Sequence, residues 1–110
     1  MNVEKFAENF GYDIICMPSP ERNIEGGYTG DLLSWVMGKA QTDNAWITIM
    51  SNINVAAVAT LTDVACVILA EGVAMEVDVI KTAEEKGINV LSTSLSAYEA
   101  ALALRELLGE

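Results

Sequence analysis

Short apolar runs alternate with helix-period segments along this chain, and a small polar turn separates most runs from the helix that follows. The runs predict strands at residues 14–17, 45–50, 64–70 and 88–91. A strand, a turn and a helix in repeated order form the unit of a parallel sheet. The run at 64–70 is almost continuously apolar, which is typical of a central strand covered on both faces. The pattern therefore predicts an α/β fold, a three-layer α/β/α sandwich around a mostly parallel sheet of four or five strands.

Helix-period patterns fill the intervals between these runs. They predict helices at residues 3–10, 31–40, 55–61, 76–86 and 97–108, and a short edge strand is expected at 23–28. Asn54 is expected to cap the third helix, and either Ser94 or Ser96 the last one. The helix at 55–61 is apolar nearly all round, so we expect it to be buried on more than one side.

The same periodicity predicts which side chains face the interior. The expected core comprises Val58, Leu61, Val67, Ile68, Leu69, Ile80, Val90 and Leu102. The helix at 31–40 is expected to turn Leu32, Leu33, Val36, Met37 and Ala40 to one face, and the helix at 76–86 to turn Val77, Ile80 and Ala83 inward. Trp35 falls beside its helix's apolar stripe, which is typical of an interface residue.

Composition limits the classes of function. The chain has 110 residues and is expected to form one domain, residues 1–110. Its net charge is -10, from 16 acids and 6 bases that do not cluster, so nucleic acid and membrane surfaces are not expected partners. The polar N-terminus lacks a signal-peptide core, and we therefore expect a cytoplasmic protein.

The residues of acid–base and metal chemistry are scarce. The chain has no histidine, which removes the commonest general base and the commonest metal ligand. Its two cysteines, Cys16 and Cys66, lie in apolar runs without metal-binding spacing and are expected in the core. No P-loop motif occurs. No enzyme activity, metal site or cofactor is expected.

The turns after the strands are the candidate ligand site, because parallel strands bring their carboxyl ends to one edge of a sheet. Glycines there allow close backbone approach, and hydroxyls near helix N-termini suit polar ligands. The candidate residues are Gly27, Tyr28, Thr29, Gly30, Asp31, Ser51, Asn52, Asn54, Glu71, Gly72, Ser92, Thr93 and Ser94. The alternative interpretations are structural: a tight turn near Gly27, helix caps at residues 51–54 and 92–94, and a solvated loop acid at Glu71.

The four turns contain no lysine or arginine. A polyphosphate ligand would therefore rest on backbone N–H groups and hydroxyls, or on a magnesium ion held by Asp31 or Glu71. The acidic Asp63 precedes a strand, so we expect it at the opposite edge, away from the site.

Taken together, several segments resemble small stand-alone members of the DRTGG-domain family. They are residues 27–38 (GYxGDLLSxVMG), 45–49 (AWITI), 54–59 (NVAAVA) and 68–72 (ILxEG). The resemblance implies a fold similar to the N-terminal domain of HPr kinase/phosphorylase. It also implies a regulatory, ligand-sensing or assembly role, because DRTGG domains occur beside CBS pairs and phosphotransacetylases. It implies no kinase activity, since that chemistry resides in a separate P-loop domain.

The chain departs from the motif that names this family. The family's Asp-Arg falls at Ser51 and Asn52, and its Thr-Gly-Gly falls at residues 70–72, where only Gly72 is retained. The arginine that could face an anionic ligand is therefore missing.

Two functions remain open at this point. The first is a non-catalytic regulatory domain that binds a nucleotide or another small polar ligand at the carboxyl ends of the strands. The second is a structural partner subunit that docks on a larger metabolic or redox enzyme. In either case we expect a homodimer. The helix at 55–61 and Trp35 carry more apolar surface than one small core can bury, and a second copy would cover the rest.

Overall fold

The computed structural model describes residues 1–109 and contains one five-stranded sheet of order β1-β5-β4-β3-β2. Four strands run parallel, and β1 pairs antiparallel with β5 at one edge. The central strand is β4, as its continuous apolar run predicts. The strands are β1 (Asp13–Cys16), β2 (Gly26–Thr29), β3 (Asn44–Thr48), β4 (Cys66–Leu69) and β5 (Val90–Ser92).

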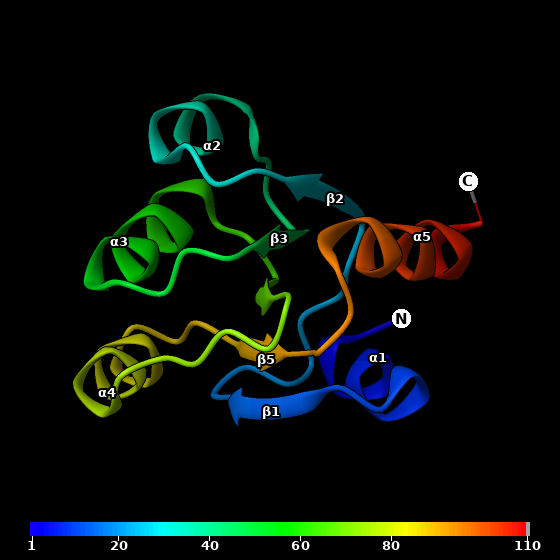
Figure 1. Cartoon of the computed structure of the whole chain (residues 1–110), viewed down its shortest axis with the longest axis horizontal. Helices are drawn as coiled ribbons and strands as arrows, with labels where there is room; N and C mark the ends of the chain where they lie inside the picture. The colour runs from blue at the N-terminus through cyan, green and yellow to red at the C-terminus, as the bar shows by residue number, and fades with distance from the viewer. Residues whose placement is uncertain (110) are drawn as a thin grey trace.

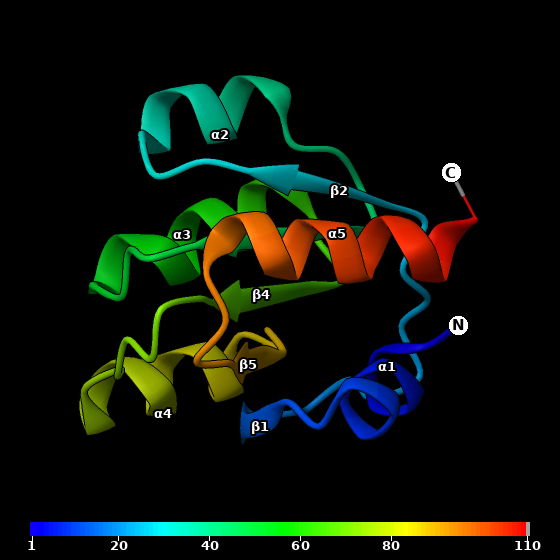
Figure 2. The same cartoon turned by 45° about the vertical axis from the view of Figure 1, so that its right-hand side comes forward.

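Within residues 1–109, five helices cover the two faces of this sheet (Figures 1 and 2). They are α1 (Val3–Phe10), α2 (Leu33–Lys39), α3 (Ile53–Thr62), α4 (Val77–Glu85) and α5 (Ala97–Leu108). Helices α1 and α5 pack on one face, and α2, α3 and α4 pack on the other. The predicted three-layer α/β/α architecture with a mostly parallel sheet is confirmed. No helix among residues 1–109 is long and apolar enough to cross a membrane.

Polar side chains fix where several helices begin. Asn52, and not Asn54, caps α3, and its Oδ1 accepts the N–H of Asn54 at 2.9 Å. Ser96 is the cap of α5, where it forms a reciprocal capping box with Glu99. The predicted caps were thus wrong by two residues for α3, and the choice between Ser94 and Ser96 is settled for α5.

The core expectation was wrong for Leu61 and Leu102, which are 69% and 50% exposed. Helix α5 buries Ala100 and Leu104, which lie four residues apart, and Leu102 points away from that stripe because each residue turns the helix by about 100°. Val58, Val67, Ile68, Leu69 and Val90 are buried as expected, and Ile80 is half-buried.

Two of the expected apolar stripes are displaced around their helices. Helix α4 buries Val79 and Ala83, whereas Val77 is exposed. In α2 only Val36 is fully buried, and Leu32 and Met37 face solvent because the helix is short and lies over the edge of the sheet. The predictions of inward-facing Val77, Leu32 and Met37 were therefore wrong.

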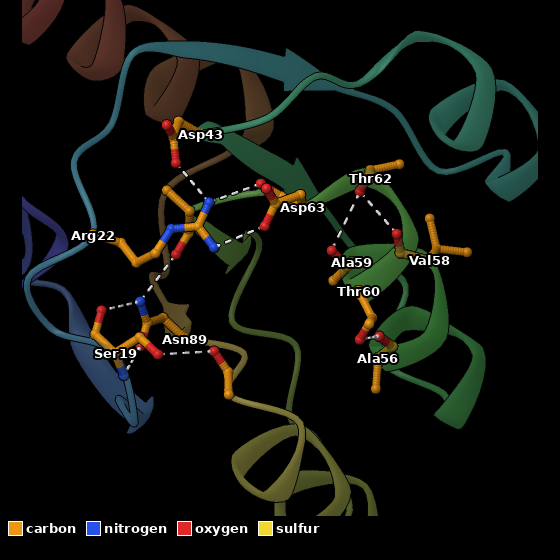
Figure 3. A network of polar contacts seen from close by, with 12 residues as sticks. Ser19, Arg22, Asp43, Ala56, Val58, Ala59, Thr60, Thr62, Asp63 and Asn89 are labelled. Atoms are coloured by element: carbon orange, nitrogen blue, oxygen red, sulfur yellow. Dashed lines mark hydrogen bonds and ion pairs between the residues drawn. The ribbon is translucent and has the colours of Figure 1, made fainter.

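The amino ends of β3 and β4 are joined by Arg22 (Figure 3). Its guanidinium donates to Asp43 Oδ1 at 2.6 Å, and to Asp63 Oδ1 at 3.0 Å. Asp63 therefore lies at the edge opposite the candidate site, as predicted. Both aspartates adopt positive φ, so Arg22 holds two strained turns together.

Candidate functional site

The carboxyl ends of β2, β3, β4 and β5 meet at one edge of the sheet because these strands are parallel. We call the loops that follow them, residues 30–32, 49–52, 70–76 and 93–96, the carboxyl edge. Nine predicted site residues lie in or beside these loops: Gly30, Asp31, Ser51, Asn52, Asn54, Glu71, Gly72, Thr93 and Ser94. Ser92 is the last residue of β5 and adjoins them.

The three remaining predicted site residues precede the loop after β2, and Thr29, the last residue of that strand, adjoins Gly30. Gly27, Tyr28 and Thr29 form β2 and not a turn, because the edge strand extends to residue 29. Gly27 and Thr29 line a shallow pocket of about 140 Å³ between β2 and α5. The ring of Tyr28 instead lies against Gly30, where an added Cβ would be 3.0 Å from its Cε2.

Two side chains of β3 hold the loop after β2. The indole N–H of the fully buried Trp46 donates to the Gly30 carbonyl at 2.9 Å. The Thr48 hydroxyl donates to Asp31 Oδ1 at 2.8 Å, and the Ile49 N–H donates to the same oxygen at 3.0 Å. Asp31 thus joins two strand ends, and this oxygen already accepts two hydrogen bonds before any ligand binds.

The turn after β4 is strained, and hydrogen bonds fix it to the loop after β5. Glu71 and Gly72 both have positive φ, 61° and 70°, and the Val73 N–H donates to the Ala70 carbonyl across the turn. The N–H groups of Glu71 and Gly72 donate to the Leu95 and Thr93 carbonyls. A glutamate in the left-handed region costs about 1 kcal/mol, and such strain is often found at functional sites.

The polar side chains that remain at this edge are few. Within residues 1–109, the side chains of Ser51, Glu71 and Ser94 make no hydrogen bond or ion pair to the protein. The charged residues in the loops are Asp31, Glu71 and Glu76, without a lysine or arginine. The carboxyl edge is therefore acidic, and its available side chains include the hydroxyls of Ser51 and Ser94 and the carboxylates of Glu71 and Glu76.

Nucleophilic and metal chemistry have little support in the described part of the chain. Burial raises the pKa of the Cys66 thiol to about 12, and it also raises the pKa of Cys16. A thiol in this state is a poor nucleophile at neutral pH. Residues 1–109 contain no group of three or more acidic or cysteine side chains placed to hold a metal ion.

Sequence reasoning missed two residues with structural roles. Asn89 is 1% exposed and forms hydrogen bonds with Ser19 and Ala65. The sequence feature that could have revealed it is a lone amide side chain within the apolar run 88–91. Arg22 joins Asp43 to Asp63. The sequence feature that could have revealed it is that Arg22 is the single basic residue between Lys5 and Lys39. Neither residue lies at the carboxyl edge.

Comparison with known proteins identifies related domains. Residues 35–107 match the sequence profile of the DRTGG domain. The fold matches the crystal structure of the CBS and DRTGG domains of the regulatory region of Clostridium perfringens pyrophosphatase, which holds the activator diadenosine tetraphosphate, with a TM-score of 0.70 and 12% identity. The match covers 96% of this chain and 45% of that one. No curated protein matches the sequence.

Proposed function

Since this chain belongs to the DRTGG-domain family, we propose that it is a non-catalytic regulatory domain whose effector site is the carboxyl edge of its sheet. Related DRTGG and CBS domains form the regulatory region of a pyrophosphatase. The observation that carries the proposal is the convergence of four strand ends on one edge, with Ser51, Glu71 and Ser94 available there. In open α/β sheets this edge is where ligands bind.

The charge of the edge restricts the effector. Asp31, Glu71 and Glu76 repel a free phosphate group, and the four loops supply no cation to offset its charge. A nucleotide would therefore bind together with a magnesium ion, and the Glu71 carboxylate would contact that ion. A neutral nucleoside would bind without the metal, through hydroxyls and backbone groups.

A thermal-shift comparison of adenosine, ATP and Mg·ATP tests this proposal. Adenosine and Mg·ATP should raise the melting temperature, and ATP with chelator should not. A ligand at one hundred times its Kd stabilises by about 2.7 kcal/mol, a shift of several degrees for a domain of this size. No shift with any probe, or the largest shift with metal-free ATP, would contradict an acidic effector site.

An assembly role is the second candidate, and exposed apolar side chains at the same edge favour it. Leu32, Ile49 and Val77 lie in or beside the four loops and are largely exposed. Such residues are typical of protein interfaces. A flat ligand screen together with stable co-purification of one defined enzyme would favour this role.

The non-catalytic character has its own test. Incubation with γ-labelled ATP and magnesium should transfer no phosphate to the chain or to a co-purified protein. Transfer that is lost in Asp31→Ala, a residue at the proposed site, would establish an enzyme and overturn this part of the proposal.

A further inference from the structure

Helix α3 presents an outward face without a charged residue. Its sheet side buries Val55, Ala56, Val58, Ala59 and Thr62. On the opposite side Ile53, Ala57 and Leu61 recur every four residues, and they are all exposed. The exposed fractions of Ile53 and Leu61 are 50% and 69%. This helix therefore has an apolar stripe that nothing within the described chain covers.

The threonines of α3 satisfy their own hydroxyls (Figure 3). Thr60 donates to the Ala56 carbonyl at 2.8 Å, and Thr62 donates to the Val58 carbonyl at 2.8 Å. Thr60 is exposed beside the stripe. Because its donor is already bonded within the helix, a partner could cover Thr60 without leaving that donor unpaired.

Helix α2 packs beside α3 in the same layer. Its Trp35 is 57% exposed to solvent. Its one charged residue is Lys39, whose ammonium lies 4.3 Å from the centre of the Trp35 ring. Neither α2 nor α3 contains an acidic residue.

The other helices are acidic. Glu4 and Glu8 lie on α1, Glu99 and Glu106 lie on α5, and α4 carries Asp78, Glu84 and Glu85. A chain of net charge -10 repels its own copies through such surfaces. Two copies could approach through α2 and α3 without bringing acidic side chains into the contact.

We propose that two copies of this chain associate through the α2–α3 face, which we define as Trp35, Ile53, Ala57, Thr60 and Leu61. A stable interface buries about 800 Å² on each partner. A helix of ten residues is only about 15 Å long, so α3 alone is too small and α2 must contribute. A closed two-fold dimer places the same stripe on both sides, with the small Ala57 at its middle.

Sedimentation velocity of the full chain at low micromolar concentration tests this interface. The wild type should sediment as a dimer, and Leu61→Glu and Trp35→Glu should each weaken dimerisation at least tenfold. Tyr98→Glu is the matched control, because Tyr98 is 73% exposed on α5 in the opposite layer. It should leave the dimer unchanged, and circular dichroism should confirm that all three variants fold.

Salt supplies an independent readout. Raising the ionic strength screens the repulsion between two acidic chains, so the dimer should tighten with salt. A wild type that sediments only near 11.8 kDa would overturn the proposal. A dimer that resists both Leu61→Glu and Trp35→Glu, or one that Tyr98→Glu dissociates, would also overturn it, because the interface would lie elsewhere.

Discussion

The side chain of Asn89 and the backbone of Ser19 form a reciprocal pair of hydrogen bonds. The Ser19 N–H donates to Asn89 Oδ1 at 2.9 Å, and Asn89 Nδ2 donates to the Ser19 carbonyl at 2.7 Å (Figure 3). The same nitrogen donates to the Ala65 carbonyl at 2.9 Å. One buried amide therefore holds the proline-rich turn at residues 18–20 against the amino end of the sheet.

Replacing Asn89 should destabilise the fold without touching the carboxyl edge. Asn89→Ala removes three hydrogen bonds, to the Ser19 N–H and to the Ser19 and Ala65 carbonyls, and the Ser19 carbonyl keeps the Arg22 N–H as a donor, so the free energy of unfolding should fall by about 2–3 kcal/mol. Asn89→Asp keeps the shape but places a carboxylate beside two carbonyls, and its loss at neutral pH should be at least as large. Urea denaturation measures both variants. A loss below about 1 kcal/mol in Asn89→Ala would show that the amide contributes little.

Two glycines should respond to alanine in opposite directions. At Gly27 an added Cβ would collide with Leu104 Cδ2, so the Leu104 side chain of α5 must move and Gly27→Ala should cost about 1 kcal/mol. At Gly38, inside α2, an added Cβ meets nothing within 4 Å, so Gly38→Ala should stabilise by about 1 kcal/mol. Thermal unfolding of both variants measures the difference. Equal effects would mean that α5 does not pack this closely on β2.

Alkaline pH should weaken the fold through its buried thiol. Burial raises the pKa of Cys66 from 9.0 to about 12. Below pH 9 both folded and unfolded chains keep this proton, and above it the unfolded chain loses the proton first. The free energy of unfolding should therefore fall as pH rises from about 9 to 12, by up to about 1.4 kcal/mol per pH unit.

Cys66→Ala should flatten this dependence, although Tyr12 and Cys16 retain a smaller slope of the same sign because burial raises the pKa of both. Urea titrations between about pH 8 and 11 compare the slopes. If wild type and Cys66→Ala lose stability in parallel, the thiol is not the group responsible.

Glu71 should separate stability from effector binding. Glu71→Gly relieves a positive φ of 61° and should stabilise the fold by about 1 kcal/mol, while it removes the Glu71 carboxylate from the site. Its melting temperature should rise and its response to Mg·ATP should fall. Glu71→Gln keeps the strain and loses only the charge, so it should lower the response without the gain in stability. An undiminished response in both variants would exclude Glu71 from the site.

The fold was predictable because strong local patterns agreed with its tertiary structure. The run at 64–70 is apolar on both faces, and β4 is the buried central strand. The errors arose where periodicity was ambiguous. In α3 nearly every residue is apolar, so the sequence cannot distinguish the buried Val58 from the exposed Leu61.

The candidate site was only partly predictable for a related reason. Asp31 and Glu71 follow strands, and that position alone places them at the carboxyl edge. The glycines near residue 27 indicated a turn, but Gly27 lies in β2, where the Leu104 side chain of α5 packs closely against it. That contact joins residues far apart in the sequence, and local patterns do not encode it. The same applies to the bonds between Asn89 and Ser19.

Amide chemical-shift mapping is the sharpest test of an effector site at the carboxyl edge. Isotopically labelled protein would be titrated with adenosine and with Mg·ATP. The shift changes should saturate and should be confined to the carboxyl edge and the adjoining Asn54, that is to residues 30–32, 49–54, 70–76 and 93–96. Saturable changes centred on Gly27 and Leu104, beside the pocket between β2 and α5, or no change with either probe, would contradict it.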